Sequence, residues 1–154
     1  MTGELRLATV EDVPWLVRLG RQFHAASGYA ATIPLDEDDL AKSMRRIIRS
    51  RDAFLLVQVD DMDVVHGAIA IASARSFFNA SVTVGVEQFF WVDSHARRRG
   101  VGRSILRRAV ELSRGVGISV LTMVSLEALE PGTAGEFYES EGFTLAEHSY
   151  VKRL

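Results

Sequence analysis

Apolar positions either alternate with polar ones or recur at helical spacing along most of the chain, and this pattern predicts its elements. Residues Leu5–Ala8 alternate and predict a short first strand. A capping-box spacing begins at Thr9, and Pro14 suits the first turn of a helix. Apolar residues then recur at helical intervals, which predicts a helix that ends near Gly28. After a loop that ends at Pro34, acidic residues begin and arginines end a second helical pattern, as the helix dipole favours.

The middle of the chain has the pattern of three strands followed by a helix. Phe54–Val59 and Val64–Ala74 are apolar runs joined by a polar loop, which predicts an antiparallel hairpin with Gly67 as a candidate bulge. A third strand is predicted at Val82–Val92. The amphipathic pattern that follows predicts a helix ending at Gly115.

The last part of the chain predicts a crossover, a helix and a strand. Ile118–Val124 is a short apolar strand, and the β-α-β unit that it completes should place it parallel to the strand before the helix. A capping-box spacing at Thr133 predicts a helix that closes at Gly142, and Phe143–Val151 predicts a final strand. The resulting order, β-α-α-β-β-β-α-β-α-β, defines an α+β fold with a mixed sheet flanked by helices, in one domain over residues 1–154.

Composition excludes several classes of function. The chain has 154 residues, 47% of them hydrophobic, which suits one globular domain with a core. It has no cysteine, so disulfides, thiolate metal sites and cysteine nucleophiles are excluded. A net charge of -2 disfavours nucleic-acid binding, no run approaches the roughly 20 apolar residues of a membrane span, and the first residues show no signal-peptide pattern. We therefore expect a cytoplasmic protein.

One stretch, Glu87–Ser104, combines the features of an anion-binding site. An apolar run that ends at Val92 predicts a buried strand, and it leads into arginines and two glycines just before a helix. The first N–H groups of a helix lack internal partners, and the helix dipole adds partial positive charge there. Because glycine lets a ligand approach the backbone closely, the sequence predicts a phosphate-binding turn.

Three pieces of the chain together resemble the GNAT family of N-acetyltransferases. They are the acetyl-CoA signature Arg97-x-x-Gly100-x-Gly102, the helical pair Phe137-Tyr138, and Gly142-Phe143 at the end of that helix. The resemblance implies the acyl-CoA N-acyltransferase fold, in which the sheet is splayed at its centre. It also implies an enzyme that moves the acetyl group of acetyl-CoA to a primary amine, on a small molecule or a peptide, by direct attack in a ternary complex.

The same resemblance implies where acetyl-CoA binds. The pantetheine arm would lie between the splayed strands, and the pyrophosphate would lie on backbone N–H groups at the start of the next helix. The residues implied are Phe90, Trp91, Val92, Arg97, Arg98, Arg99, Gly100, Val101, Gly102, Arg103 and Ser104. For Arg103, Arg107 and Arg108, a solvated helix face without a ligand is the alternative.

Catalytic roles follow from the resemblance and from the chemistry of amines. An alkyl ammonium with a pKa of about 10.4 is almost wholly protonated at neutral pH, so a base is needed. Glu87 resembles the family's base, and Tyr138 resembles its general acid, which would protonate the departing thiolate. A backbone N–H near Phe90 or Trp91 would stabilise the oxyanion. The alternatives are an exposed strand-end carboxylate for Glu87 and an amphipathic core residue for Tyr138.

The remaining candidate residues concern the acceptor. His24 and Tyr29 border the loop that shapes the acceptor pocket in the family. The other histidines are scattered singly, and the sequence has no metal-site pattern. Pro131 stands where the family often has an Asn near the cofactor arm, so that contact is missing or supplied from elsewhere. Glu127 and Glu130 are either solvated loop charges or a surface for a cationic acceptor.

Two further readings of function remain beside the enzyme. One is a non-catalytic CoA-binding or regulatory domain of the same fold. The other is a nucleic-acid-binding protein that uses the arginine cluster, which would bind DNA or RNA with a steep dependence on salt. Homodimers are common in the family, so both a monomer and a homodimer remain open for this chain.

Overall fold

Most of the predicted elements are present in the computed structural model, which describes residues 3–126, 128–129 and 132–154. The strands and α-helices, in chain order, are β1 (Glu4–Leu7), α1 (Val13–Ser27), α2 (Glu37–Arg49), β2 (Ala53–Val59), β3 (Val65–Arg75), β4 (Thr83–Val92), α3 (Val101–Gly115), β5 (Val120–Thr122) and α4 (Thr133–Ser140). Short 3-10 helices, Val10–Asp12 and Tyr29–Ala31, precede and follow α1. Among these described residues, no helix combines the length and the apolar character needed to cross a membrane.

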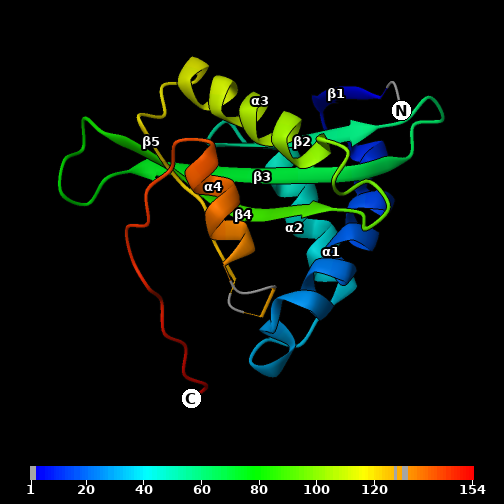
Figure 1. The fold of residues 1–154 in the computed structure, drawn as a ribbon, viewed down its shortest axis with the longest axis horizontal. Helices are drawn as coiled ribbons and strands as arrows, with labels where there is room; N and C mark the ends of the chain where they lie inside the picture. The colour runs from blue at the N-terminus through cyan, green and yellow to red at the C-terminus, as the bar shows by residue number, and fades with distance from the viewer. Residues whose placement is uncertain (1–2, 127, 130–131) are drawn as a thin grey trace.

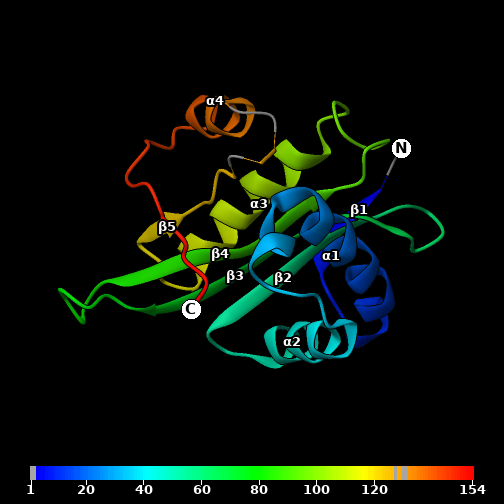
Figure 2. The same cartoon turned by 90° about the horizontal axis from the view of Figure 1, so that it is seen from below.

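The strands form one sheet with helices on both faces. The strand order is β1-β2-β3-β4-β5, in which the first four strands are antiparallel neighbours and β4 and β5 are parallel (Figure 1). α1 and α2 pack on one face of the sheet, where Val57 and Phe89 belong to the core, and α3 packs on the other, with Ile69 and Val92 (Figure 2). The predicted fold class, an α+β mixed sheet flanked by helices, is confirmed.

β4 and β5 separate after a short contact. Their parallel pairing covers three residue pairs and ends at Val86 with Thr122. β4 continues to Val92, and over this second half its strand partner among the described residues is β3 alone. A β-bulge at Gln88 adds to the local bend, because the register between β3 and β4 shifts there. One backbone edge of β4 is therefore open where the sheet is splayed.

Two predicted details differ from the structure. The predicted capping box at Thr133 is wrong, because Gly132 occupies the N-cap of α4 and no side chain caps the helix there. The bulge in the hairpin lies one residue before Gly67, where His66 is the extra residue opposite β2. Both differences are local and leave the order of the elements unchanged.

The predicted final strand, Phe143–Val151, is wrong. Residues 143–154, all of which the structure describes, contain no strand, and they lead away from the sheet after α4 (Figure 1). A strand-like sequence pattern is not sufficient for a strand, because the backbone groups also need a neighbouring strand to pair with. The order within one chain is thus β-α-α-β-β-β-α-β-α.

Candidate active site

The turn between β4 and α3 leads directly into a helix N-terminus. The N–H groups of Ala96 and Arg97 donate to the Asp93 carbonyl at 2.9 and 3.1 Å, which reverses the chain. Arg98 and Gly100 adopt φ angles of 63° and 80°, in the left-handed region that glycine tolerates best. α3 begins directly after Gly100, so the N–H groups of its first turn have no helical partners.

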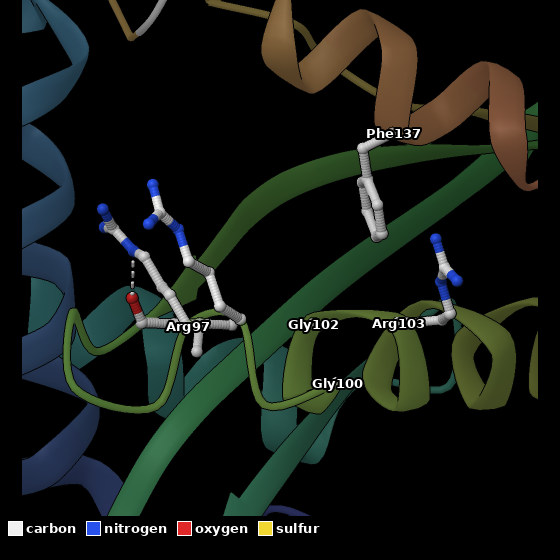
Figure 3. A pocket seen from close by; sticks show the side chains of 7 residues that line it. Arg97, Gly100, Gly102, Arg103 and Phe137 are labelled. Carbon is white, nitrogen blue, oxygen red and sulfur yellow. Dashed lines mark hydrogen bonds between the residues drawn. The ribbon is translucent and has the colours of Figure 1, made fainter.

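A cleft of about 470 Å³ adjoins this turn (Figure 3). Arginine side chains lie along one part of its wall, and an aromatic ring from α4 lies across from them (Figure 3). The lining residues are Val92, Arg97, Arg98, Gly100, Gly102, Arg103 and Phe137. Cationic side chains beside a helix N-terminus favour an anionic ligand that carries phosphate groups.

Gly102 is a helical glycine at a position where the fold does not require one. A Cβ atom there would lie 3.8 Å from both Phe90 and Val92, which is an ordinary van der Waals contact. The φ angle of Gly102 is not positive, and alanine would favour the helix over glycine. The remaining reason for a glycine at the cleft wall is the close approach of a ligand to the backbone.

Glu87 and Tyr138 meet where β4 and β5 separate. Glu87 is buried, with 8% of its surface exposed, and its Oε2 atom accepts a hydrogen bond of 3.0 Å from the Val124 backbone N–H. The Tyr138 hydroxyl lies 3.4 Å from the same oxygen and 3.3 Å from the Val124 carbonyl. The Glu87 carboxylate thus accepts the hydrogen bond that the Val124 N–H would otherwise donate to a neighbouring strand. The two predicted catalytic residues, Glu87 and Tyr138, are in contact.

Burial changes the proton affinity of both groups. Desolvation raises the pKa of Glu87 to about 7, although hydrogen bonds from Val124 and Tyr138 oppose this shift. Burial and the adjacent Glu87 carboxylate raise the pKa of Tyr138 above its usual range. Near neutral pH, Glu87 is therefore able to accept a proton while Tyr138 holds one to donate. The burial of Glu87 does not fit an exposed strand-end carboxylate.

Ion pairs hold α4 against α3. Glu141, just beyond the end of α4, lies 2.8 Å from the Nε atoms of both Arg103 and Arg107. No residue of α4 is fully buried, so these contacts act together with the Tyr138 hydroxyl contacts to position the helix. Arg108 instead pairs with Glu111 of its own helix. The solvated-face alternative therefore fits Arg108, whereas the other two arginines link the helices.

Several of the residues implied for acetyl-CoA lie outside the cleft lining. They are Phe90, Trp91, Arg99, Val101 and Ser104. Trp91 packs on the α1 side of the sheet, where its Nε1–H donates to Gln22 and the Arg97 guanidinium lies 4.2 Å from its ring centre. Phe90 and Val101 pack against the core beneath α3. The side chains of these residues pack within the protein or face solvent. A ligand in the cleft would therefore contact their backbone N–H and C=O groups rather than their side chains.

The predicted acceptor residues lie at and after the end of α1. The His24 Nε2 atom lies 2.6 Å from the Ile33 carbonyl and ties the helix to the following loop. Tyr29 lies within that loop and is partly exposed. A Cβ atom at Gly28 would lie 3.1 Å from the side chain of Ala128, so this loop lies beside the one that follows β5. Three other residues considered for this region, Glu127, Glu130 and Pro131, lie outside the described residues.

Two histidines that are far apart in the sequence meet near the turn. His95 Nε2 lies 3.1 Å from His66 Nδ1, and the other ring nitrogen of His66 lies 2.8 Å from the Asp60 carboxylate. The Asp93 Oδ2 atom lies 3.4 Å from His66 Nδ1, and both carboxylate oxygens of Asp93 accept hydrogen bonds from Arg18. Protein partners thus account for both ring nitrogens of His66 and both carboxylate oxygens of Asp93, and ligand atoms of His66, Asp93 and His95 lie within 4.8 Å of one another. The contact joins residues 29 positions apart, so no local sequence pattern signals it.

Comparison with known proteins identifies the family. The profile of the acetyltransferase (GNAT) domain matches residues 50–145. The chain therefore belongs to the GNAT acetyltransferase family. A comparison with curated proteins found no match.

Solved structures share this fold over nearly their whole length. A tetramutant of the BH1408 protein from Bacillus halodurans has a TM-score of 0.81 at 19% identity, over 98% of this chain and 99% of that one. An aminoglycoside acetyltransferase from an uncultured soil sample has a TM-score of 0.75 at 18% identity, over 100% and 99%. A ribosomal-protein-alanine N-acetyltransferase from Brucella melitensis biovar Abortus has a TM-score of 0.76 at 16% identity, over 99% and 100%. At these identities the likeness shows the fold alone.

Proposed function

We propose that this protein is an acetyl-CoA-dependent N-acetyltransferase that transfers the acetyl group to a primary amine by direct attack in a ternary complex. The contact between Glu87 and Tyr138 carries the proposal, because it joins a base whose pKa is near neutrality to a proton donor. Membership of the GNAT family supports acetyltransferase activity in general.

The residues around the cleft fit acetyl-CoA. The open edge of β4 beyond Val86 offers backbone groups to the amides of a pantetheine arm. The first turn of α3 offers N–H groups, with no side chain at Gly102, to the pyrophosphate. Arg98 and Arg103 add positive charge to the cleft wall. When bound, acetyl-CoA supplies the activated acetyl thioester.

Glu87 and Tyr138 divide the proton transfers between them. The acceptor ammonium releases one proton to water, and the Glu87 carboxylate accepts the second proton as the amine nitrogen bonds to the acetyl carbon. Tyr138 donates its phenolic proton to the sulfur as the carbon–sulfur bond breaks. The 3.4 Å contact then lets the proton pass from Glu87 to the Tyr138 oxygen, which restores both groups. A backbone N–H of β4 near Phe90 or Trp91 is the proposed oxyanion donor.

The acceptor is a primary amine on a small molecule or a peptide, and the loops beside His24 and Tyr29 are the proposed walls of its site. Two proteins of similar fold are named for different acceptors, an aminoglycoside and a ribosomal-protein alanine. Loops rather than the sheet therefore decide the acceptor, since the fold is common to both.

Turnover of acetyl-CoA across a panel of amines tests the proposal. The panel contains aminoglycosides, polyamines, amino acids and peptides with free N-termini, and free thiol release is followed. For an amine that supports turnover, Glu87→Gln and Tyr138→Phe should each lower kcat by roughly 10²- to 10⁴-fold. Glu111→Gln is the matched control, because Glu111 is exposed on α3 and pairs only within that helix, and it should retain full activity.

Two results would contradict the proposal in different ways. If Glu87→Gln and Tyr138→Phe both keep wild-type turnover, the catalytic roles are wrong although the activity stands. If CoA binds by calorimetry but no amine in the panel supports turnover, the chain is a CoA-binding domain without catalysis. Calorimetry on the same samples separates these results from a loss of cofactor binding.

A further inference from the structure

Three side chains of the kinds that bind metal ions converge beside the turn that follows β4. They are His66 of β3 and, from the turn, Asp93 and His95, and one ligand atom of each lies within 4.8 Å of the other two. Imidazole nitrogen and carboxylate oxygen are donors that Zn²⁺ takes in proteins. His66 and His95 are 29 positions apart, so only the fold brings this group together.

The separations of the ligand atoms suit one tetrahedral metal ion. His66 Nδ1 lies 3.1 Å from His95 Nε2 and 3.4 Å from Asp93 Oδ2. Two ligand atoms bound to a tetrahedral ion at about 2.0–2.1 Å lie roughly 3.3–3.4 Å apart. The third separation, between Asp93 and His95, is at most 4.8 Å, and the exposed ring of His95 has room to shorten it. Small movements of side chains are therefore enough to surround an ion.

The Asp60 carboxylate orients the His66 ring from behind. Asp60 Oδ1 accepts hydrogen bonds from the N–H groups of Met62 and Val64 at 2.9 and 3.0 Å, and Oδ2 lies 2.8 Å from His66 Nε2. Because a carboxylate only accepts hydrogen bonds, the proton of the neutral His66 ring is on Nε2 and the lone pair is on Nδ1. A histidine ligand whose other nitrogen donates to a carboxylate is the usual arrangement around a bound metal ion.

Asp93 contributes an oxygen atom with a second acceptor site. Its side chain is 3% exposed, and Arg18 donates one hydrogen bond to each of its carboxylate oxygens. Each carboxylate oxygen has about two acceptor sites, so Oδ2 has one for a second partner on the side of His66. Without a cation, this oxygen faces the His66 lone pair at 3.4 Å, which is an unfavourable contact. A bound cation would turn this repulsion into two attractive contacts.

The backbone holds the three ligand residues together in advance. The Asp93 N–H donates to the His66 carbonyl at 2.8 Å, and the N–H groups of Ala96 and Arg97 donate to the Asp93 carbonyl. His66 is also the extra residue of the β-bulge, a feature that often redirects a side chain beside a functional site. The rings of His66 and His95 meet edge-on, with centres 4.9 Å apart. Ligands held in this way lose little conformational freedom when they bind an ion.

We propose that His66, Asp93 and His95 bind one divalent transition metal ion of the zinc type, through His66 Nδ1, a carboxylate oxygen of Asp93 and His95 Nε2. The ion replaces the direct contact between the two rings, and the exposed side at His95 leaves the fourth position to water. One ligand comes from β3 and two come from the turn that leads to α3, so the ion ties this turn to the sheet. The site is separate from Glu87 and Tyr138 and does not depend on the proposed acetyl transfer.

Titration of the chelator-treated protein with Zn²⁺ tests the site without any assay of activity. The wild type should bind one Zn²⁺ per chain by calorimetry, and Co²⁺ in its place should give the visible absorption of a tetrahedral site. His95→Gln should weaken Zn²⁺ binding by roughly 100-fold or more, since a direct ligand contributes more than an outer-shell partner. The His95 side chain is exposed, so this change spares the core. His148→Gln, which removes an exposed histidine outside the group, is the matched control and should bind Zn²⁺ as the wild type does.

Two further measurements separate a built site from surface binding. Asp60→Asn presents an amide N–H to His66 Nε2, which favours the wrong tautomer, so Zn²⁺ affinity should fall about 10- to 100-fold with one site retained. Zn²⁺ should raise the thermal midpoint of the wild type and of His148→Gln but not of His95→Gln. A wild type that does not bind Zn²⁺, a His95→Gln protein that binds it with wild-type affinity, or an equal loss of affinity in His148→Gln would each overturn the proposal.

Discussion

At the scale of single residues, burial sets the behaviour of Glu87 and Tyr138. Burial removes water from around both side chains and disfavours the carboxylate and the phenolate, so it raises the pKa of both groups. The Glu87 carboxylate further disfavours a phenolate at Tyr138, while the Tyr138 hydroxyl favours the carboxylate. The pair thus keeps its phenol protonated near neutral pH and leaves the carboxyl group free to titrate.

Replacing Glu87 by Gln should raise stability at high pH. The pKa of Glu87 is about 7 in the folded protein, against about 4.3 in an unfolded chain. Between these values the folded state binds the extra proton, so the free energy of unfolding falls as pH rises through this window. Glu87→Gln removes the ionisation and should gain roughly 3 kcal/mol relative to wild type between pH 5 and pH 8. Urea unfolding of both proteins at the two pH values measures the difference.

Glu111→Gln serves as the comparison for this change of charge. Glu111 is exposed on α3, so its replacement should leave the same difference from wild type at pH 5 and pH 8. A Glu87→Gln protein whose stability follows the wild type in parallel across these pH values would show that Glu87 is not a buried carboxyl group.

Gly102→Ala should weaken acetyl-CoA binding without harming the fold. The added methyl group makes only ordinary contacts with Phe90 and Val92, and alanine gains up to about 1 kcal/mol of helix propensity over glycine. The thermal midpoint should therefore stay the same or rise, while the dissociation constant for CoA rises about tenfold or more. Calorimetric titration with CoA and a thermal melt measure the two effects. An unchanged CoA affinity would show that no ligand approaches this backbone.

The sequence predicts the residue types at this site but not the contacts between them. The resemblance pointed to Glu87 and Tyr138 separately, and the structure places them 3.4 Å apart. Neither the bulge at Gln88 nor the pairing of His66 with His95 had a local signal, because each depends on which strand residues face each other. Spacing along one chain does not encode such tertiary register.

At the scale of elements, the helices and the five strands of the sheet were predictable, and the conformation of the C-terminal segment was not. Amphipathic periodicity and end signals located α1, α2 and α3, since each buries one face against the sheet. The final strand was predicted from its apolar pattern, yet one chain offers residues 143–154 no partner strand. A strand forms only where another strand lies beside it to pair with, so an apolar pattern alone does not place one.

The docking of α4 makes a prediction at this scale. Arg107 joins α3 to Glu141 beyond α4, whereas Arg108, the next residue, pairs with Glu111 on α3 itself. Arg107→Gln should therefore speed amide hydrogen exchange in α4, because no residue of that helix is fully buried and its end depends on this contact. Arg108→Gln should leave exchange in α4 unchanged. Equal exchange in the two variants would mean that the ion pair does not position α4.

At the scale of the whole molecule, a buried ion pair connects the two layers around the sheet. Arg18 of α1 donates to both Asp93 oxygens, at 3.0 and 2.9 Å, and to the Val65 carbonyl at 2.7 Å. Asp93 begins the turn that leads to α3 on the opposite face. Burial alone would raise the pKa of Asp93, but the Arg18 guanidinium holds it below its usual value. The pair therefore fixes the anion-binding turn relative to the α1 layer.

Removing one partner of the Arg18–Asp93 pair should lower the free energy of unfolding strongly, and removing both should cost less than the sum of the two single changes. Arg18→Met leaves the Asp93 carboxylate, 3% exposed, without its main partner, which should cost about 3 kcal/mol of unfolding free energy. Arg18→Met with Asp93→Asn removes the uncompensated charge, so its cost should fall below the sum of the single variants by about 1 kcal/mol or more. Arg21→Met on the same helix breaks only an exposed pair with Glu37 and should cost less than about 1 kcal/mol. Strict additivity in a urea-unfolding cycle would show that the two layers are not coupled through Arg18 and Asp93.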